Sequence, residues 1–429
     1  MKHDELTRRQ FLINTARSYL GVSLPPLLGA SIGSQCQASV APLRARAARS
    51  VIFLNMNGGM SHIDTFDPKP ESKRVQGPVE VIQTAADGIR VTEYLPKMAQ
   101  EMDKVAVINS MNTTQGAHEQ GQYMIHRSYP KRGTIVHPAI GSWVLRLSGR
   151  LNGSIPGFVT IAGDPEDAGS GFLGARYAGV PIGNPKDGLK DSERASGVTE
   201  KEFRKRLSVA DSLNKSFHSK FKQSNVQGYE RLYDEAVKLM RSEDLKAFDI
   251  SDEPKPMRDL YGDHGFGQGC LLARRLVEHR VKYVEVTLGG WDSHYDNFTT
   301  VPARCAHLDQ GMSALLKDLD RRGLLEETLV VLGTEFGRTP EIVEEHRNGR
   351  DHFPRAFTCL MAGGGIQGGQ SYGRTDRKGM KVVDKLTTIQ DFNATIAYAL
   401  GIDHEQVITS PSGRPFRISD KGKPITDLF

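Results

Sequence analysis

The sequence predicts an α/β fold in which a doubly wound, mostly parallel sheet is sandwiched by helices. Runs of Val, Ile and Leu recur at strand length, as is typical of strands buried on both faces of a parallel sheet. Helix-like stretches lie between several of these runs, which favours helices on both sides of the sheet. The predicted strands are 51–56, 104–111, 157–162, 282–290, 328–334 and 356–362, and the predicted helices are 119–129, 226–245, 269–280, 303–323 and 388–401.

The first element, residues 1–41, is predicted to be a twin-arginine export signal and linker. Arg8 and Arg9 precede Phe11 and Leu12, and a weakly apolar run that ends in small residues follows. A proline-broken amphipathic helix of the mature protein is the open alternative. The run is too polar to make a stable membrane span. We therefore expect the twin-arginine translocation machinery as a partner and a periplasmic or extracellular location.

The remaining chain, residues 42–429, is predicted to form a single domain. Residues 163–225 interrupt the alternation of strands and helices and are rich in Gly, Pro, Asp, Lys and Ser. A long irregular segment inside a compact domain is typical of a substrate lid or of a poorly ordered surface element, and this stretch is predicted to be an insertion that caps the sheet. The formal net charge of +5 is scattered along the sequence, which argues against nucleic-acid binding.

The first site candidates follow strand 51–56, in the stretch "NGGMSHIDTFDPKP". Ligands of open α/β sheets bind beyond the carboxyl ends of the strands. The two glycines let the backbone approach a ligand closely, and His62 and Asp64 have side chains that bind metals. A polar turn before Pro68 explains the same residues, and both interpretations stay open.

Two later strand ends also carry metal-binding side chains. Asp292 and His294 follow strand 282–290, and a spacing of two on an extended backbone sends both side chains to one face, as one shared ion requires. Glu335 follows strand 328–334, and His352 lies in the next loop. A solvated turn is the alternative for the first pair, and an ion-pair network is the alternative for the second group.

Cationic and helix-terminal groups near these strand ends suit an anionic ligand. Arg338 and Arg350 can each hold an anionic oxygen ligand bidentately. Thr114 and His118 precede a predicted helix, whose N-terminus offers free N–H groups and a positive dipole to an anion. His118 is equally well explained as an ordinary histidine near a helix start.

The motifs "RRQFL", "NGGMSHIDTFDPKP", "GGWDSH", "GTEFGRTP", "GRDH" and "GKPITDLF" occur in one order. Together they resemble an exported bacterial family known as domain of unknown function 1501. The resemblance implies membership of the alkaline phosphatase and sulfatase superfamily, with an alkaline-phosphatase-like core and metal ligands at strand ends. It places Asn57 where the superfamily has its first Asp, and Phe336 where the second site has a His.

The function implied by the resemblance is an exported, metal-dependent hydrolase of phosphate or sulfate esters. The divalent ion would be zinc, calcium or magnesium, and the substrate an anionic ester or polysaccharide. The alternative is a non-catalytic exported protein of the same fold, with at most a structural metal, that binds a partner protein or a polysaccharide. The implied metal ligands are Asp292, His294, His352, Glu335, Asp64 and His62, the implied catalytic residues are Ser61, Thr114 and His118, and the implied substrate-binding residues are Arg338 and Arg350.

Overall fold

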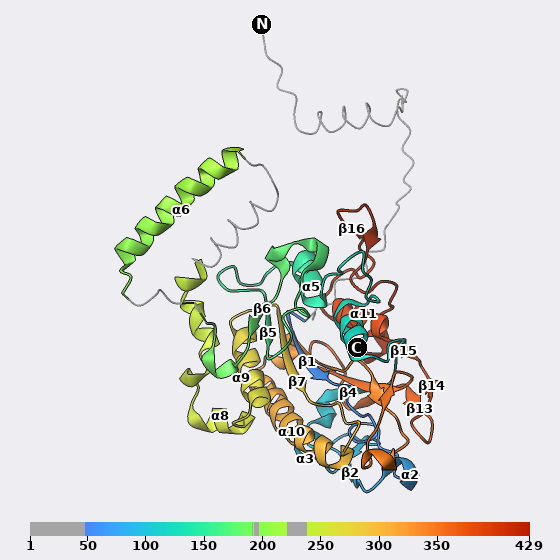
Figure 1. The fold of residues 1–429 in the computed structure, drawn as a ribbon. Coiled ribbons are helices and arrows are strands. Elements are labelled where there is room, and N and C mark those ends of the chain that lie inside the picture. The colour runs from blue at the N-terminus through green and yellow to red at the C-terminus, as the bar shows by residue number, and fades with distance from the viewer. Residues whose placement is uncertain (1–47, 191, 193–196, 221–237) are drawn as a thin grey trace, which may run out of the picture. The chain divides into compact units, whose positions relative to one another are not determined.

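The structure, a computed structural model, describes residues 48–190, 192, 197–220 and 238–429 (Figure 1). The predicted export signal, 1–41, and the first part of the predicted helix 226–245 lie outside these residues. Residues 48–429 belong to one compact unit. Within the described ranges, we find no helix with the length and apolar character needed to cross a membrane.

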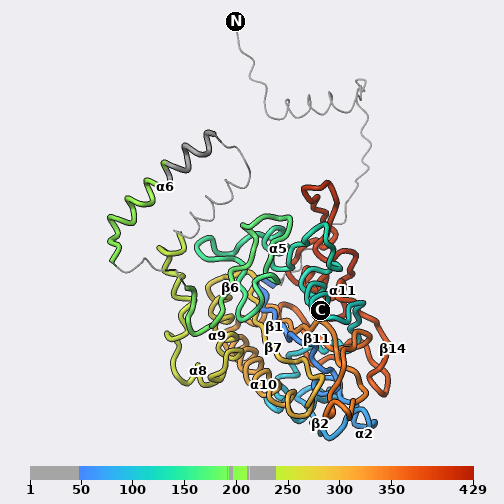
Figure 2. Tube along the Cα trace, viewed as in Figure 1, coloured from blue at the N-terminus to red at the C-terminus, as the bar shows by residue number. Residues whose placement is uncertain are grey.

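A nine-stranded sheet forms the centre of the described chain, with the order β12-β4-β11-β8-β1-β7-β5-β6 and with β15 pairing with β4. Its strands run parallel except β11, which is antiparallel to both β4 and β8. Figure 2 shows β1 beside β7, although the two come from distant parts of the chain. The strands are β1 (Ser50–Asn57), β4 (Val105–Asn112), β5 (Phe158–Ile161), β6 (Val180–Ile182), β7 (Tyr283–Gly289), β8 (Thr328–Gly333), β11 (Phe357–Ala362), β12 (Gln370–Tyr372) and β15 (Thr387–Thr388).

Helices cover both faces of this sheet, as Figure 1 shows for α9 and α10 on one side and α5 and α11 on the other. Ile52 and Leu54 of β1 belong to the apolar cluster that contains α9 and α10, whereas Val51 and Phe53 belong to the opposite cluster. Successive side chains of a strand point to opposite faces, so a strand between two layers must be apolar throughout. The predicted fold class is confirmed. The covering helices are α4 (His118–Arg127), α5 (Ile140–Ser148), α9 (Gly265–Glu278), α10 (Asn297–Arg321) and α11 (Ile389–Ala399).

The six strands predicted from apolar runs are all present, and each end lies within one residue of its predicted position. The described part of segment 163–225 is more regular than its composition suggests, because β6 pairs with β5 and extends the sheet. The other elements are the helices α2 (Lys73–Gln76), α3 (Pro96–Ala99), α6 (Glu200–Lys220) and α8 (Lys255–Tyr261), and the strand pairs β2 (Val81–Gln83) with β3 (Arg90–Thr92), β9 (Gly337–Arg338) with β10 (His352–Phe353), β13 (Arg374–Thr375) with β14 (Val382–Asp384), and β16 (Ile408–Thr409) with β17 (Pro415–Phe416).

Candidate metal centre

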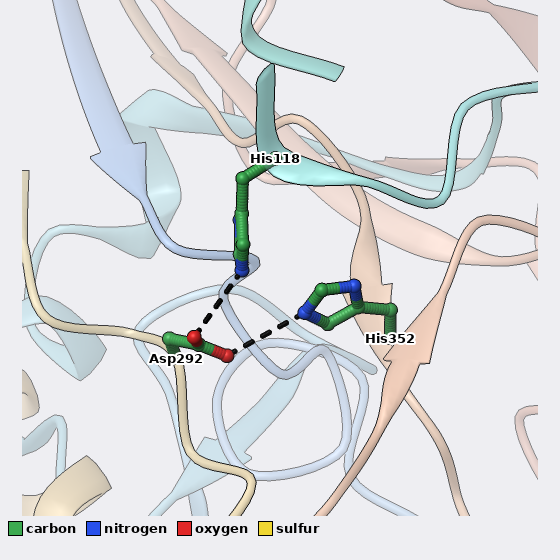
Figure 3. A group of neighbouring side chains, drawn as sticks. All are labelled: His118, Asp292 and His352. Carbon is green, nitrogen blue, oxygen red and sulfur yellow. Dashed lines mark ion pairs between the residues drawn. The ribbon is translucent and has the colours of Figure 1, made fainter. Parts of the chain in front are cut away.

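Three side chains with metal-binding atoms meet at the carboxyl edge of the sheet: His118, Asp292 and His352 (Figure 3). His118 is the first residue of α4, which follows β4, Asp292 follows β7, and His352 begins β10. One ligand atom of each lies within 4.8 Å of the others, and Figure 3 shows the side chains pointing toward one another. Loops after parallel strands thus bring together residues from three distant parts of the sequence.

His294 lies beside this group and faces the same carboxylate. Its Nε2 is 2.9 Å from Nε2 of His352 and 3.4 Å from Oδ1 of Asp292. Nε2 of His118 is 3.4 Å from Oδ2 of Asp292, and Nε2 of His352 is 3.5 Å from Oδ1. Neighbouring ligand atoms around a tetrahedral zinc ion lie about 3.3 Å apart, because each bond is about 2.0–2.1 Å long. The three separations that involve Asp292 match this spacing, and the separation between His294 and His352 is shorter.

The other ring nitrogen of each histidine is held by a fixed acceptor. Carboxylate and carbonyl oxygens only accept hydrogen bonds, so the proton of each neutral ring lies on Nδ1 and the lone pair on Nε2. Such outer partners set the orientation of metal-bound histidines. The three bonds run from His118 Nδ1 to Glu335 Oε1 at 2.8 Å, from His294 Nδ1 to Asp351 Oδ1 at 2.7 Å, and from His352 Nδ1 to the Gly116 carbonyl oxygen at 2.7 Å.

The resulting arrangement fits a bound cation. Lone pairs on Nε2 of His294 and of His352 face each other at 2.9 Å, which is repulsive unless a proton or a metal ion lies between them. Nε2 of His118 is buried and has no hydrogen-bond partner in the part of the chain that the structure describes. Two imidazole nitrogens and one carboxylate, from His118, His352 and Asp292, converge as donors that zinc accepts, and His294 lies beside Asp292 and His352.

Arg338 fixes the carboxylate of this centre and keeps it charged. Its Nη2 donates to Oδ1 of Asp292 at 2.6 Å, and the guanidinium is fully buried. Burial by itself raises the pKa of Asp292, but the bond and the charge of Arg338 outweigh burial and lower that pKa below its ordinary value. The Glu335 bond raises the pKa of His118, whereas burial lowers the pKa of His352.

The glycines of "NGGMSH" allow the loops of two strands to touch. Gly58 has a φ of +121°, and a Cβ at this position would lie 2.7 Å from the backbone nitrogen of Asp292. Its own N–H donates to Oε1 of Glu335 at 3.0 Å. The close backbone approach expected from the sequence therefore serves the packing of loops around the centre.

The predicted substrate arginines are placed differently from expectation. Besides its bond to Asp292, Arg338 donates to the carbonyl oxygens of Gly58, of Gly59 at 2.9 Å and of Arg350 at 3.1 Å. Arg350 is fully buried, and its donors are taken by Asp64 and by three backbone carbonyls. Through these bonds both arginines hold loops in place, and their role in substrate binding stays a prediction.

His62, Asp64 and Ser61 lie in this neighbouring buried network and do not join the metal-binding group. Asp64 forms an ion pair with Arg350 at 2.8 Å, and both side chains are fully buried. His62 Nε2 bonds the Gly379 carbonyl oxygen at 3.0 Å, and burial lowers its pKa to about 4. The Ser61 hydroxyl is buried and accepts from the backbone of Asp64 at 3.3 Å. Among the described residues, His62 and Asp64, which the resemblance implied as metal ligands, thus lie outside the group that could hold an ion, and Glu335 contacts that group only through its bond to His118.

Thr114 is exposed, and its hydroxyl accepts a hydrogen bond from Gln115 at 3.0 Å. His118, expected from sequence as a catalytic residue, lies among the metal-binding side chains. Sequence reasoning assigned no role to Asp351 or to the Gly116 carbonyl. Carboxylates commonly orient metal-bound histidines, but Asp351 bonds His294 and not its chain neighbour His352, so its position in the sequence did not reveal its partner.

Comparison with known proteins yields a family match and distant structural similarities. Residues 48–429 match the family described as "Protein of unknown function (DUF1501)", and no curated protein matches. The solved structures that resemble the chain include a phosphonate monoester hydrolase from Silicibacter pomeroyi, with 10% identity, 88% of this chain and 76% of that chain covered, and a TM-score of 0.40. The match to a sulfatase from Pseudoalteromonas has 12% identity, covers 88% of this chain and 73% of that chain, and has a TM-score of 0.38. The match to the C-terminal periplasmic domain of EcEptC from Escherichia coli, in complex with Zn, has 10% identity. It covers 87% of this chain and 86% of that chain, with a TM-score of 0.39.

Proposed function

The chain belongs to the DUF1501 family of proteins of unknown function, and from the chemistry of its metal centre we propose that it is a metal-dependent hydrolase of phosphate or sulfate esters. The observation that carries the proposal is the pair of Nε2 atoms of His294 and His352, which face each other at 2.9 Å beside a carboxylate. Each ring is oriented through its Nδ1, as in a preorganised ligand set.

The ion is proposed to be zinc, held by His118, Asp292, His294 and His352. Nitrogen-rich sites favour zinc, whereas calcium and magnesium prefer sites made mostly of oxygen. A divalent ion at this position supplies a Lewis acid that polarises an ester oxygen and lowers the pKa of a water molecule. A single set of ligands is proposed, because Asp64 is neutralised by Arg350 instead of facing a second ion.

The helix α4 is proposed to help bind the anionic part of the ester. His118 stands at the start of this helix, and the first intrahelical bond there is donated by Gly121 to the Ala117 carbonyl. The N–H groups of the preceding residues have no acceptor within the helix, and the helix dipole adds positive potential at this end. This role adds to the substrate binding that the sequence predicts for Arg338 and Arg350.

The attacking group is proposed to be water, because the expected side-chain nucleophiles are poorly placed. Ser61 is buried within its own turn, where its oxygen accepts from the Asp64 backbone. Thr114 is exposed, its hydroxyl accepts from Gln115, and no base among the described residues is bonded to that hydroxyl. An activated hydroxyl nucleophile needs an adjacent base to take its proton. Export by the twin-arginine pathway to the periplasm or the exterior is also proposed, on the sequence of residues 1–41 alone.

The test is elemental analysis of the purified protein, followed by assays on aryl phosphates and aryl sulfates. The wild type should hold about one equivalent of zinc, because one donor set is formed. His352→Ala and Asp292→Ala should lose the zinc and the hydrolysis together, whereas the matched control His279→Ala should keep both. A wild-type protein without bound metal, or a metal-free variant with full activity, contradicts the proposal.

The second candidate function is a non-catalytic protein of the same fold with one structural metal. Two observations favour it: the Ser61 hydroxyl is buried, and the Asp64 carboxylate is paired with Arg350. Two groups that a hydrolase would use are therefore not free to act. Zinc bound at one equivalent with no hydrolysis of any aryl ester would select this function over the first.

A further inference from the structure

A cavity of about 470 Å³ lies at the amino ends of strands β5 and β6. Gly157, which directly precedes β5, lines it together with Val180 and Pro181, which begin β6. His118 and Asp292 of the metal centre instead follow the carboxyl ends of β4 and β7, which run in the same direction as β5 and β6. The cavity, which we call the β5–β6 pocket, therefore lies at the opposite edge of the sheet from the metal centre.

The walls of the β5–β6 pocket are aliphatic, and no aromatic side chain is among the lining residues that the structure describes. Its larger apolar side chains are Leu145, Ile155, Val180, Leu189, Leu239 and Met240. One wall is closely packed, because a Cβ on Gly157 would lie 2.7 Å from Cδ2 of Leu145 on α5. Without a ring to stack on, a planar ligand gains little there, whereas a flexible hydrocarbon chain is stabilised by burial alone.

The polar part of the β5–β6 pocket is positively charged. Among the described lining residues, none is acidic and three are basic: Arg150, Arg176 and Lys190. A fourth cation adjoins them, because a Cβ on the lining residue Gly153 would lie 3.6 Å from Nζ of Lys238. Asp187 pairs with Lys190 at 3.2 Å, but this pair is exposed to solvent, and an ammonium group has three donors. The charges are therefore complementary to a ligand with one anionic end.

We propose that the β5–β6 pocket binds a long-chain fatty acid, with the hydrocarbon chain against the aliphatic walls and the carboxylate at the basic side chains. Burial of methylene groups supplies the main part of the binding free energy, and charge-assisted hydrogen bonds orient the carboxylate. The volume lies in the lower part of the range for ligand sites, about 300–1,000 Å³, which favours one hydrocarbon chain over the two of a phospholipid. The binding does not depend on hydrolysis, because the pocket and the metal-binding group share no residue.

Calorimetric titration of the full protein with dodecanoate tests the pocket without relying on activity. The wild type should bind about one equivalent of dodecanoate, because the pocket has room for a single chain. Two probes separate the contributions of the chain and of the charge. Butyrate has a much shorter chain, and dodecyltrimethylammonium has the same chain with a positive head, so each should bind at least about tenfold more weakly than dodecanoate.

Variants of the pocket test where dodecanoate binds. Leu239→Glu places a carboxylate on the wall and should weaken dodecanoate binding by about tenfold or more, whereas the matched control Leu260→Glu, on α8 and outside the pocket, should not. Arg176 is exposed, so Arg176→Gln should fold normally and weaken binding by about threefold, with Arg374→Gln on the strand β13 as the control. Thermal unfolding shows whether each variant is folded.

Four results would overturn the inference. The absence of saturable dodecanoate binding is expected if another part of this chain fills the pocket. Equal binding of dodecyltrimethylammonium would show that the basic side chains have no role. A wild-type dimer that Leu239→Glu converts to a monomer would assign the pocket to a second copy of the chain. Loss of dodecanoate binding in His352→Ala would place the carboxylate at the metal centre, whereas binding within about twofold of the wild type supports the pocket, whether or not this variant hydrolyses esters.

Discussion

Helix α4 carries histidines of two different clusters, and the clusters differ in what the ring nitrogens face. His118 begins the helix and belongs to the metal centre, whereas His126 lies about two turns further along. Nδ1 of His126 bonds the Gln122 carbonyl oxygen at 2.8 Å, and Nε2 bonds Oε1 of Glu285 at 2.9 Å. Both nitrogens of His126 are thus partnered inside the protein, whereas Nε2 of His118 has no hydrogen-bond partner in the described ranges.

The surroundings of the His126 cluster are also closed and balanced in charge. His126 and Arg127 face the two carboxylates of Glu285 and Asp167, and these four side chains are between 1% and 14% exposed. Burial lowers the pKa of His126, but the charges of Glu285 and Asp167 outweigh burial and raise it to about 9. The side chains of the metal centre are between 23% and 48% exposed. A paired, buried histidine stabilises the fold, whereas a half-exposed, oriented histidine whose second ring nitrogen has no hydrogen-bond partner is suited to a ligand.

The largest expected effect tests the structural role of the His126 cluster. Glu285→Ala removes the bonded partner of a buried, charged imidazole, and we expect the free energy of unfolding to fall by about 3–5 kcal/mol. Asp292→Ala, in the metal-free protein, should change it by less than about 1 kcal/mol, because Asp292 is half exposed and Arg338 keeps its carbonyl acceptors. Urea denaturation measures both. Equal losses in the two variants would remove the distinction between the clusters.

The next effect is a pH dependence that the His126 cluster should show. The pKa of His126 is about 9 in the folded chain and near 6.5 in the unfolded chain. Its contribution to stability is therefore complete below about pH 6.5 and is lost as the pH rises through about 9, with a total on the order of 3 kcal/mol. His126→Gln should lack this decline. Stability curves of wild type and variant that stay parallel from neutral to alkaline pH would contradict the assignment.

The sequence predicts the fold well, because strands that are buried on both faces of the sheet are continuous runs of apolar residues. Strands such as β1 and β7 are recognisable from the identity of their residues alone. Asp292 and His294 were predicted as ligands for a similar local reason, since both follow one strand in a fixed spacing, and the structure places their side chains 3.4 Å apart. Local patterns of this kind do not depend on the rest of the chain.

The parts that the sequence did not predict depend on contacts between distant segments. Asp64 and Arg350 are 286 residues apart, and nothing in either motif shows that they neutralise each other in a buried ion pair. His126 is a helical residue whose partner Glu285 lies on a strand that reads as apolar. Whether a histidine faces a carboxylate, a carbonyl or an open site is decided by tertiary packing, which a single sequence does not display.

A smaller effect separates the clusters by ligand binding. At free zinc a hundredfold above its dissociation constant, the metal should stabilise the wild type by about 2.7 kcal/mol. His294→Ala removes one of the converging nitrogens and should lose most of this stabilisation. His126→Gln should unfold more easily but keep the same zinc-dependent increase, which thermal unfolding with and without zinc measures. If the zinc-dependent stabilisation disappears in His126→Gln, the metal binds at the His126 cluster and not at the proposed centre.

The smallest expected effect sharpens what orients the metal-binding rings. Asp351→Ala removes the acceptor of His294 Nδ1–H, which lies at 2.7 Å, and leaves all four proposed ligands in place. Loss of an orienting partner typically weakens metal affinity by 10- to 100-fold, and because His294 is about one-third exposed we expect a loss near tenfold. Asp351→Asn should lose less, since its amide oxygen still accepts from Nδ1–H. Competition with a zinc chelator measures the affinities, with Asp384→Ala on the exposed strand β14 as the control. Equal affinity in Asp351→Ala and wild type would show that His294 is held by packing alone, and that its bond to Asp351 is incidental to the centre.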